Sequence, residues 1–211
     1  YDVLTISVGG TTIHTINGYT SGTVTLPSTA VNAAYAKMTT SNSAKFTFRL
    51  TTYSSSSKTT VIGTSTKTAT GSISSTGRAP SFTTFTYADQ NATTIALTGD
   101  SSSIVQGYSL LRATVSAANK ATANKGASMS KYQLNIGGVI TEVAYGTGAV
   151  TLSNASPQSA TIGVTAIDSR GNTKTVYQTA TFIKYTDTVV KSGSASRALN
   201  GAGTETSLTY A

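Results

Sequence analysis

Apolar and polar residues alternate along several short stretches of this chain. In AKFTFRLTTY, apolar Phe46, Phe48 and Leu50 occupy every second position between polar residues. Successive side chains of a strand point to opposite faces of a sheet, so this pattern predicts a half-buried β-strand. ATIGVTAID and LLRATVSA repeat it, and the inner rows that we expect there are Ile162, Val164, Ala166 and Leu111, Ala113, Val115.

Seven candidate strands lie between Ser81 and Tyr185, separated by short turn signals. Their expected ranges are 81–88, 109–117, 130–137, 138–144, 149–153, 160–168 and 173–184. Closely spaced short strands of this number are typical of an immunoglobulin-like sandwich. Gly137-Gly138 can supply the positive φ angles of a tight hairpin between the third and fourth strands. The pattern predicts an all-β fold.

The segment VTAIDSRGNT places Asp168, Ser169 and Arg170 side by side, which invites a catalytic or cell-binding interpretation. Strands are expected on both sides of it, so we interpret it as a hairpin turn. Gly171 or Asn172 would take the left-handed position, while Asp168 or Ser169 would cap the turn. A cell-binding loop would need an acid after the glycine, where Asn172 stands. Turn chemistry accounts for every residue of the segment.

The first 78 residues resemble the later part of the second unit. YDVLTISVGGTTI matches KYQLNIGGVIT, TSGTVTL matches GTGAVTL, AKFTFRLTTY matches ATIGVTAID, and TKTATGSI matches VYQTATFI through a shared TAT. An internal repeat of about 100 residues follows. We therefore expect three parts, namely the C-terminal part of a sandwich (1–78), a complete sandwich (79–186) and the start of a third module (187–211).

The first unit has no counterpart of the second unit's first two strands. A sandwich without them would expose open edges and half of a core. We therefore expect other residues or partner chains to complete both ends of this chain, which we interpret as a piece of something longer. The short linker GSISSTGRAP, residues 71–80, predicts a stiff arrangement of the modules.

Composition narrows the function classes. Thr and Ser supply 71 of the 211 residues, a mixture that disfavours helices but suits half-exposed strands. The chain has no Cys, which excludes disulfides and thiolate metal sites. Its net charge of +8 is scattered from Lys37 to Arg197 without a run, so we expect no nucleic-acid partner. No apolar stretch is long enough to predict membrane insertion.

Candidate chemistry is sparse. His14 is the only His, and it stands as an ordinary polar position in TTIHTI, so a triad with Asp2 is not expected. Asp89, Asp100 and Asp187 could hold calcium between domains, but they lack the dense spacing of a calcium loop. We expect turn and capping roles for them. The sequence thus predicts no enzyme and no catalytic, cofactor-binding or metal-binding residue.

Eleven Tyr residues and no Trp leave one binding chemistry open. Tyr rings can stack on sugars, and five of them stand near expected loops, namely Tyr19, Tyr53, Tyr87, Tyr108 and Tyr145. The other interpretation is that these rings cover sandwich edges and corners, and we favour it.

The second unit resembles a known family. The runs IVQGYSLLRATVSA, GASMSKYQLNIGG and ATIGVTAIDSRGNTKTVYQTATFIKY are similar to the Ig-like repeat module of minor structural, tail-tip or fibre proteins. These are proteins of siphophages that infect Gram-positive bacteria of the streptococcal type. The run SASRALNGAGTETSLTYA resembles the start of the next module. The likeness covers most of residues 81–211, and residues 1–78 fit the end of a preceding module.

The resemblance implies tandem immunoglobulin-like (fibronectin III-like) antiparallel β-sandwiches in a phage tail protein located in the virion. Such a protein would be a non-enzymatic spacer and assembly surface with a role in host adhesion. Its expected partners are other tail proteins, further copies of itself and host cell-wall polysaccharide. The alternative is an adhesin or carbohydrate-binding module on a Gram-positive cell surface, and an accessory region of a cell-wall hydrolase comes third.

Overall fold

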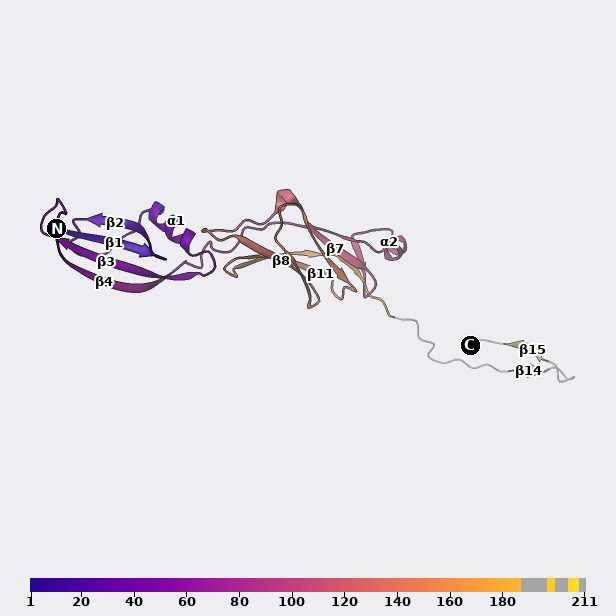
Figure 1. Ribbon diagram of the computed structural model, residues 1–211. Helices are drawn as coiled ribbons and strands as arrows, with labels where there is room; N and C mark the ends of the chain where they lie inside the picture. The colour runs from indigo at the N-terminus through magenta and orange to yellow at the C-terminus, as the bar shows by residue number, and fades with distance from the viewer. Residues whose placement is uncertain (187–196, 200–204, 209–211) are drawn as a thin grey trace.

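Over its described residues the protein is an all-β chain that carries two short α-helices. The computed structural model describes residues 1–186, 197–199 and 205–208. Figure 1 shows two bodies lying end to end, the sheet of residues 1–72 and the strands that follow residue 80. None of the described helices is long and apolar enough to cross a bilayer. The predicted fold class is confirmed at the level of an all-β protein.

The first body contains strands β1 (Asp2–Val8), β2 (Thr11–Asn17), β3 (Ser43–Tyr53) and β4 (Val61–Ser72) and helix α1 (Ser28–Lys37). The second contains strands β5 (Thr86–Asp89), β6 (Ser103–Val105), β7 (Leu110–Val115), β8 (Met129–Ile136), β9 (Val139–Ala144), β10 (Val150–Ala155), β11 (Thr161–Asp168), β12 (Thr173–Thr179) and β13 (Thr181–Ile183), together with helix α2 (Ala92–Thr98) and the 3₁₀ turn η1 (Ala117–Asn119).

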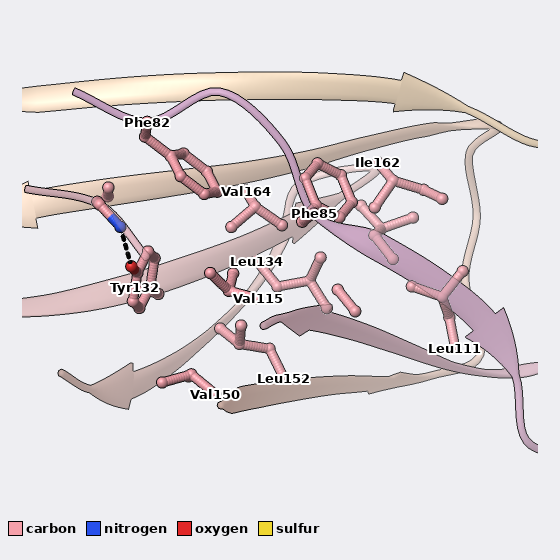
Figure 2. Packing of buried hydrophobic residues seen from close by; sticks show 14 of the residues in the cluster. Phe82, Phe85, Leu111, Val115, Tyr132, Leu134, Val150, Leu152, Ile162 and Val164 are labelled. Carbon is pink, nitrogen blue, oxygen red and sulfur yellow. Dashed lines mark hydrogen bonds between the residues drawn. The ribbon is translucent and has the colours of Figure 1, made fainter. Parts of the chain in front are cut away.

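Two antiparallel sheets of the second body pack face to face. One has the order β10-β7-β5 and the other the order β12-β11-β8-β9. The side chains between them form one buried cluster, part of which is drawn in Figure 2. The inner rows expected on β7 and β11 are confirmed, because all six side chains are fully buried. The Gly137-Gly138 hairpin is confirmed as well, with φ angles of 59° and 90°.

The secondary structure of the second body differs from the sequence prediction in three places. The strand expected at 81–88 is ordered as β5 only from Thr86, and the preceding segment buries Phe82 and Phe85 without forming a strand. The strand expected at 173–184 breaks at Ala180, and β13 then pairs in parallel with β6, which was not expected. Helix α2 was also not expected. Asn91 caps α2 at its start and Gly99, with φ 70°, ends it.

The first body repeats one sheet of the second. Its strand order β2-β1-β3-β4 corresponds to β9-β8-β11-β12. The hairpin glycines Gly9 and Gly10 have positive φ, as Gly137 and Gly138 do. By strand register, Phe46 of β3 is equivalent to Ile162 of β11, and Ala69 of β4 is equivalent to Gln178 of β12. The shared TAT segments are therefore not equivalent, and that detail of the predicted repeat is wrong.

The first body departs from the repeat between β2 and β3. TSGTVTL was expected to match strand β10, but no strand forms there, and the chain enters α1 after Pro27. Pro suits an extended position just before a helix, and the alanines of α1 favour helix. The buried side chains of this segment are Ala30, Ala34 and Met38. In chain order, helix α1 thus follows β2 where strand β10 follows β9 in the second body.

A buried carboxylate organises one end of the second body. Asp89 is 1% exposed and accepts four hydrogen bonds, two from the start of α2 and two from the start of β7. Its Oδ2 accepts from the hydroxyls of Thr94 and Ser109, and its Oδ1 accepts from the backbone N–H groups of Asn91 and Leu110. Burial acts to raise the pKa of Asp89, but the four hydrogen bonds outweigh it and the pKa lies below its ordinary value of 3.8.

This carboxylate predicts acid sensitivity of the second body. A carboxyl group whose pKa is lower in the folded than in the unfolded state stabilises the fold above its ordinary pKa. That contribution is lost as the pH falls through the folded-state pKa. We expect urea unfolding midpoints to hold from pH 7 to about pH 5 and to drop below about pH 4. Asp89→Asn should flatten the acid limb, and stability that rises on acidification would contradict this account.

The predicted third module falls almost entirely outside the described residues. In the stretch 187–211, the structure describes only strands β14 (Arg197–Leu199) and β15 (Glu205–Leu208), which pair in antiparallel fashion.

Candidate functional site

The most elaborate polar site of the described chain joins the two bodies, and Arg170 lies at its centre. Its side chain is only 8% exposed although it belongs to a turn. Nε donates to the carbonyl of Met38 and Nη2 donates to the carbonyl of Tyr35 at 3.1 Å, both at the end of α1. Nη2 also donates to the carbonyl of Lys125 in the second body, at 2.6 Å. One guanidinium thus holds backbone groups from both bodies.

The turn that presents Arg170 is fixed by its neighbours. Gly171 has φ 79°, the left-handed conformation that favours glycine. Asp168 Oδ1 accepts from the backbone N–H groups of Arg170 and Asn172 at 2.9 and 2.8 Å. The predicted turn and its Asp168 cap are therefore confirmed. The inference that turn chemistry explains every residue is wrong, because Arg170 contacts the other body.

The C-terminal end of α1 is a suitable acceptor for this cation. The last carbonyls of a helix lack intrahelical partners and carry partial negative charge. Arg170 donates to two carbonyls of that end, from Tyr35 and Met38. Burial lowers the pKa of Arg170 while nearby Asp168 and Tyr35 raise it, and the net shift is downward from its ordinary value. A guanidinium stays charged at neutral pH even so.

A second segment of the second body, residues 124–128, closes around the same helix end. Gly126 has φ 77°, and a Cβ there would lie 3.0 Å from the carbonyl of Tyr35. Glycine is thus required both for the backbone conformation and for the close approach. Lys125 Nζ donates to the carbonyl of Thr76 in the linker at 2.7 Å, and Asn124 Nδ2 donates to that of Ala79 at 2.6 Å.

The segment between α1 and β3 is also hydrogen-bonded to the second body. Asn42 and Asn172 exchange two amide hydrogen bonds, of 2.9 and 3.2 Å, across the two bodies. Ser169 donates its hydroxyl to the carbonyl of Thr39. Ile73, at the start of the linker, is buried. These hydrogen bonds join the first body directly to the second.

The residues singled out for chemistry lie apart. His14 stands in mid-strand on β2, opposite Ile6. Asp89 is enclosed by its hydrogen bonds, while Asp100 caps an exposed turn through Ser102 and Ser103. Asp187 lies outside the described residues. Among the residues that the structure describes, no group of three or more His, Cys, Asp or Glu could hold a metal ion.

The five tyrosines considered for sugar stacking do not share one surface. Tyr145 stacks on Tyr132 with centroids 5.8 Å apart, and Lys120 lies over its ring. Tyr87 packs against the buried cluster. Tyr19 and Tyr53 belong to the first body, whereas Tyr108 contacts Tyr185 edge-on at 4.5 Å in the second.

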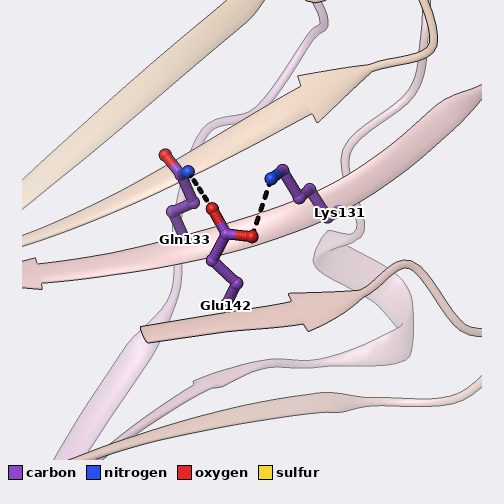
Figure 3. Close-up of polar contacts among 3 residues, drawn as sticks. All are labelled: Lys131, Gln133 and Glu142. Carbon is purple, nitrogen blue, oxygen red and sulfur yellow. Dashed lines mark hydrogen bonds and ion pairs between the residues drawn. The ribbon is translucent and has the colours of Figure 1, made fainter. Parts of the chain in front are cut away.

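A different tyrosine lies on an open sheet face. Tyr177 of β12 is 67% exposed, and a Cβ on Gly163 would lie 3.0 Å from its ring. In the next row of the same face, Glu142 accepts from Lys131 at 2.7 Å and from Gln133, as Figure 3 shows. These hydrogen bonds hold the pKa of Glu142 below its ordinary value. We call Tyr177, Lys131, Gln133 and Glu142 the outer-face patch.

No known protein family, curated protein or solved structure matches this chain. The geometry of its own residues is therefore the basis on which its function is inferred.

Sequence reasoning missed both the junction and the outer-face patch. An Arg in a turn is ordinarily solvent-exposed, and nothing local shows that a helix end lies above it. One signal was available, since Asn124, Lys125 and Gly126 precede β8 as the turn around Arg170 precedes β12. Strands β8 and β12 both run antiparallel to β11, which lies between them, so the loops that precede them emerge at the same end of the sheet. Tyr177 was missed because it stands within a strand.

Proposed function

We propose that this chain is a non-enzymatic structural protein of a phage tail, in which consecutive immunoglobulin-like modules act as a stiff spacer and assembly surface. In this proposal the modules also bring the tail to the host surface. Other tail proteins and further copies of the chain are the partners. Rigid modules set the reach, and several copies per particle multiply weak contacts with the cell.

The junction at Arg170 is the observation that carries the spacer function. If the linker were flexible and the two bodies turned freely, no charged side chain would stay buried between them. Here the guanidinium is desolvated and is compensated by carbonyls of both bodies. Losing either set of acceptors would leave a buried cation with unpaired donors, which is costly. The two bodies are therefore expected to move as one.

The strand order supports the immunoglobulin-like part of the proposal. Three strands, β5-β7-β10, face four, β9-β8-β11-β12, around one core. Seven antiparallel strands divided between two packed sheets are the pattern of that architecture. The first body repeats the four-stranded half in the same order. This recurrence supports a chain built of tandem modules.

Labelling of intact phage particles tests the tail assignment. An antibody raised against residues 1–186 should decorate the tail of particles that carry this protein, as seen by electron microscopy. Particles of a phage that lacks the gene are the control. Absence of label from the tail, with the antibody active on the isolated protein, would overturn the assignment.

The outer-face patch favours a second candidate, a carbohydrate-binding module of a bacterial surface protein. An exposed aromatic ring on the same sheet face as amide, carboxylate and ammonium groups offers stacking together with hydrogen bonds to sugar hydroxyls. Gln133 and Glu142 lie in register with each other, one row from Tyr177.

Substitution of Tyr177 tests this second candidate. We expect Tyr177→Ala to reduce binding of the protein to purified Gram-positive cell-wall polysaccharide at least tenfold, since stacking on the ring would be lost. Binding is measured by co-sedimentation with cell walls. Thr151→Ala, at an exposed position of β10 in the opposite sheet, is the matched control. Equal binding by both variants and the unaltered protein would exclude this surface.

A further inference from the structure

The inner face of the first sheet is covered on one side only. Leu4, Ile6 and Val8 of β1 are at most 7% exposed. Phe46 and Phe48 of β3 point to the same face but remain partly exposed, and the residues of β4 are exposed along nearly its whole length. This face of the sheet is therefore buried at β1, partly exposed at β3 and open to solvent at β4.

An apolar groove follows this uncovered half. Two adjoining hollows of about 170 and 260 Å³ share Leu26, Phe46 and Gly71 in their walls. Phe48 and Ala69 line the larger one. The ring of Phe46 lies over Gly71, where a Cβ would stand only 2.5 Å from it. Because Gly71 has no side chain, the groove stays open beside the ring of Phe46.

The second body shows what covers the equivalent surface there. By register, Phe46 and Phe48 correspond to Ile162 and Val164. Both of those side chains are fully buried. Figure 2 shows Phe82 and Phe85, from the segment before β5, beside Ile162 and Val164. Both phenylalanines are at most 3% exposed.

The backbone of that covering segment is held against β12. Gln178 Nε2 donates to the carbonyl of Phe85. In the first body the position of Gln178 is taken by Ala69, which lines the groove. The covering segment is therefore a Phe-x-x-Phe run without regular secondary structure, beside the edge strand β12.

We propose that the groove of Leu26, Phe46, Phe48, Ala69 and Gly71 binds an extended peptide segment with aromatic residues three positions apart. The partner is a segment of this chemistry from outside residues 1–78, laid along β3 and β4 as residues 82–85 lie along β11 and β12. The inference depends on the proposed modular architecture of the first body. It does not depend on the protein's place in a phage.

A peptide supplied in trans tests the proposal. The probe is a fluorescein-labelled peptide with the sequence of residues 79–90, APSFTTFTYADQ, titrated with the 211-residue protein. We expect saturable binding by fluorescence anisotropy. The same peptide with both phenylalanines changed to alanine should bind at least tenfold more weakly, because its anchoring groups are removed.

Two variants of β4 locate the binding site. Ala69→Asp places a charge in the groove and should abolish peptide binding, while Thr68→Asp, which points to the opposite face of the same strand, should leave it unchanged. Circular dichroism confirms that both variants are folded. No saturable binding to the unaltered protein, or equal binding by the two variants, would overturn the proposal. Tail labelling could still succeed in that case, so the two failures are distinguishable.

Discussion

Arg170→Met should lower the free energy of unfolding by about 2–4 kcal/mol, since hydrogen bonds to a charged donor are worth about 1.5–3 kcal/mol each. Methionine keeps much of the apolar stem but cannot reach the carbonyls of Met38, Tyr35 and Lys125 that the guanidinium holds. Loss of the buried charge offsets part of the effect. Urea unfolding, followed by tyrosine fluorescence, provides the measurement.

Two further variants make this result specific. Arg170→Lys keeps the charge but not the planar fork of donors. Its free energy of unfolding should therefore lie between that of Arg170→Met and that of the unaltered protein. Arg112→Met removes an exposed Arg of β7 and should have little effect. If Arg170→Met and Arg112→Met were equally stable, the junction would contribute nothing to the fold.

Asp89→Ala should destabilise the second body by about 3–5 kcal/mol, because buried donors left without an acceptor cost about 1–3 kcal/mol each. Two hydroxyls and two backbone N–H groups would lose their acceptor at once. These donors come from α2, from the segment before it and from the segment that leads into β7. We therefore expect that end of the body to open first, as faster amide hydrogen exchange at Asn91 and Leu110.

The matched control is Asp100→Ala, which removes a carboxylate that also caps a turn but stands in solvent. Water can replace the lost hydrogen bonds there, so the loss of stability should be much smaller. Equal losses for the two variants would show that burial of Asp89 contributes nothing.

The alternating pattern was sufficient to predict the sheets. Each inner residue predicted on β7 and β11 is buried, since a strand with one apolar face can bury it in only one register. The two helices were not predicted for local reasons. Helix α1 follows Pro27 in a stretch rich in alanine, and the comparison with the second unit covered only the preceding segment TSGTVTL, where it favoured a strand. Helix α2 is a short run rich in threonine, which has low helix propensity.

The junction could not be predicted because its partners are backbone carbonyls. A carbonyl carries no residue identity, so no sequence motif marks the acceptors of Arg170 at Tyr35 and Met38. The turn itself was predictable, because Asp168 and Gly171 are typical of it. The direction in which Arg170 points depends on the helix end that covers it, and that is a property of the packed pair.

The central claim is that the first two bodies form one stiff unit through the junction at Arg170. The chain has no Cys, so Thr66→Cys on β4 and Ser153→Cys on β10 give unique sites for spin labels on exposed strand positions. Pulsed electron–electron spin resonance on this double variant should give a single narrow distance distribution, which broadens when Arg170→Met is added. A distribution that is already broad with Arg170 present, or that does not change without it, would contradict the claim.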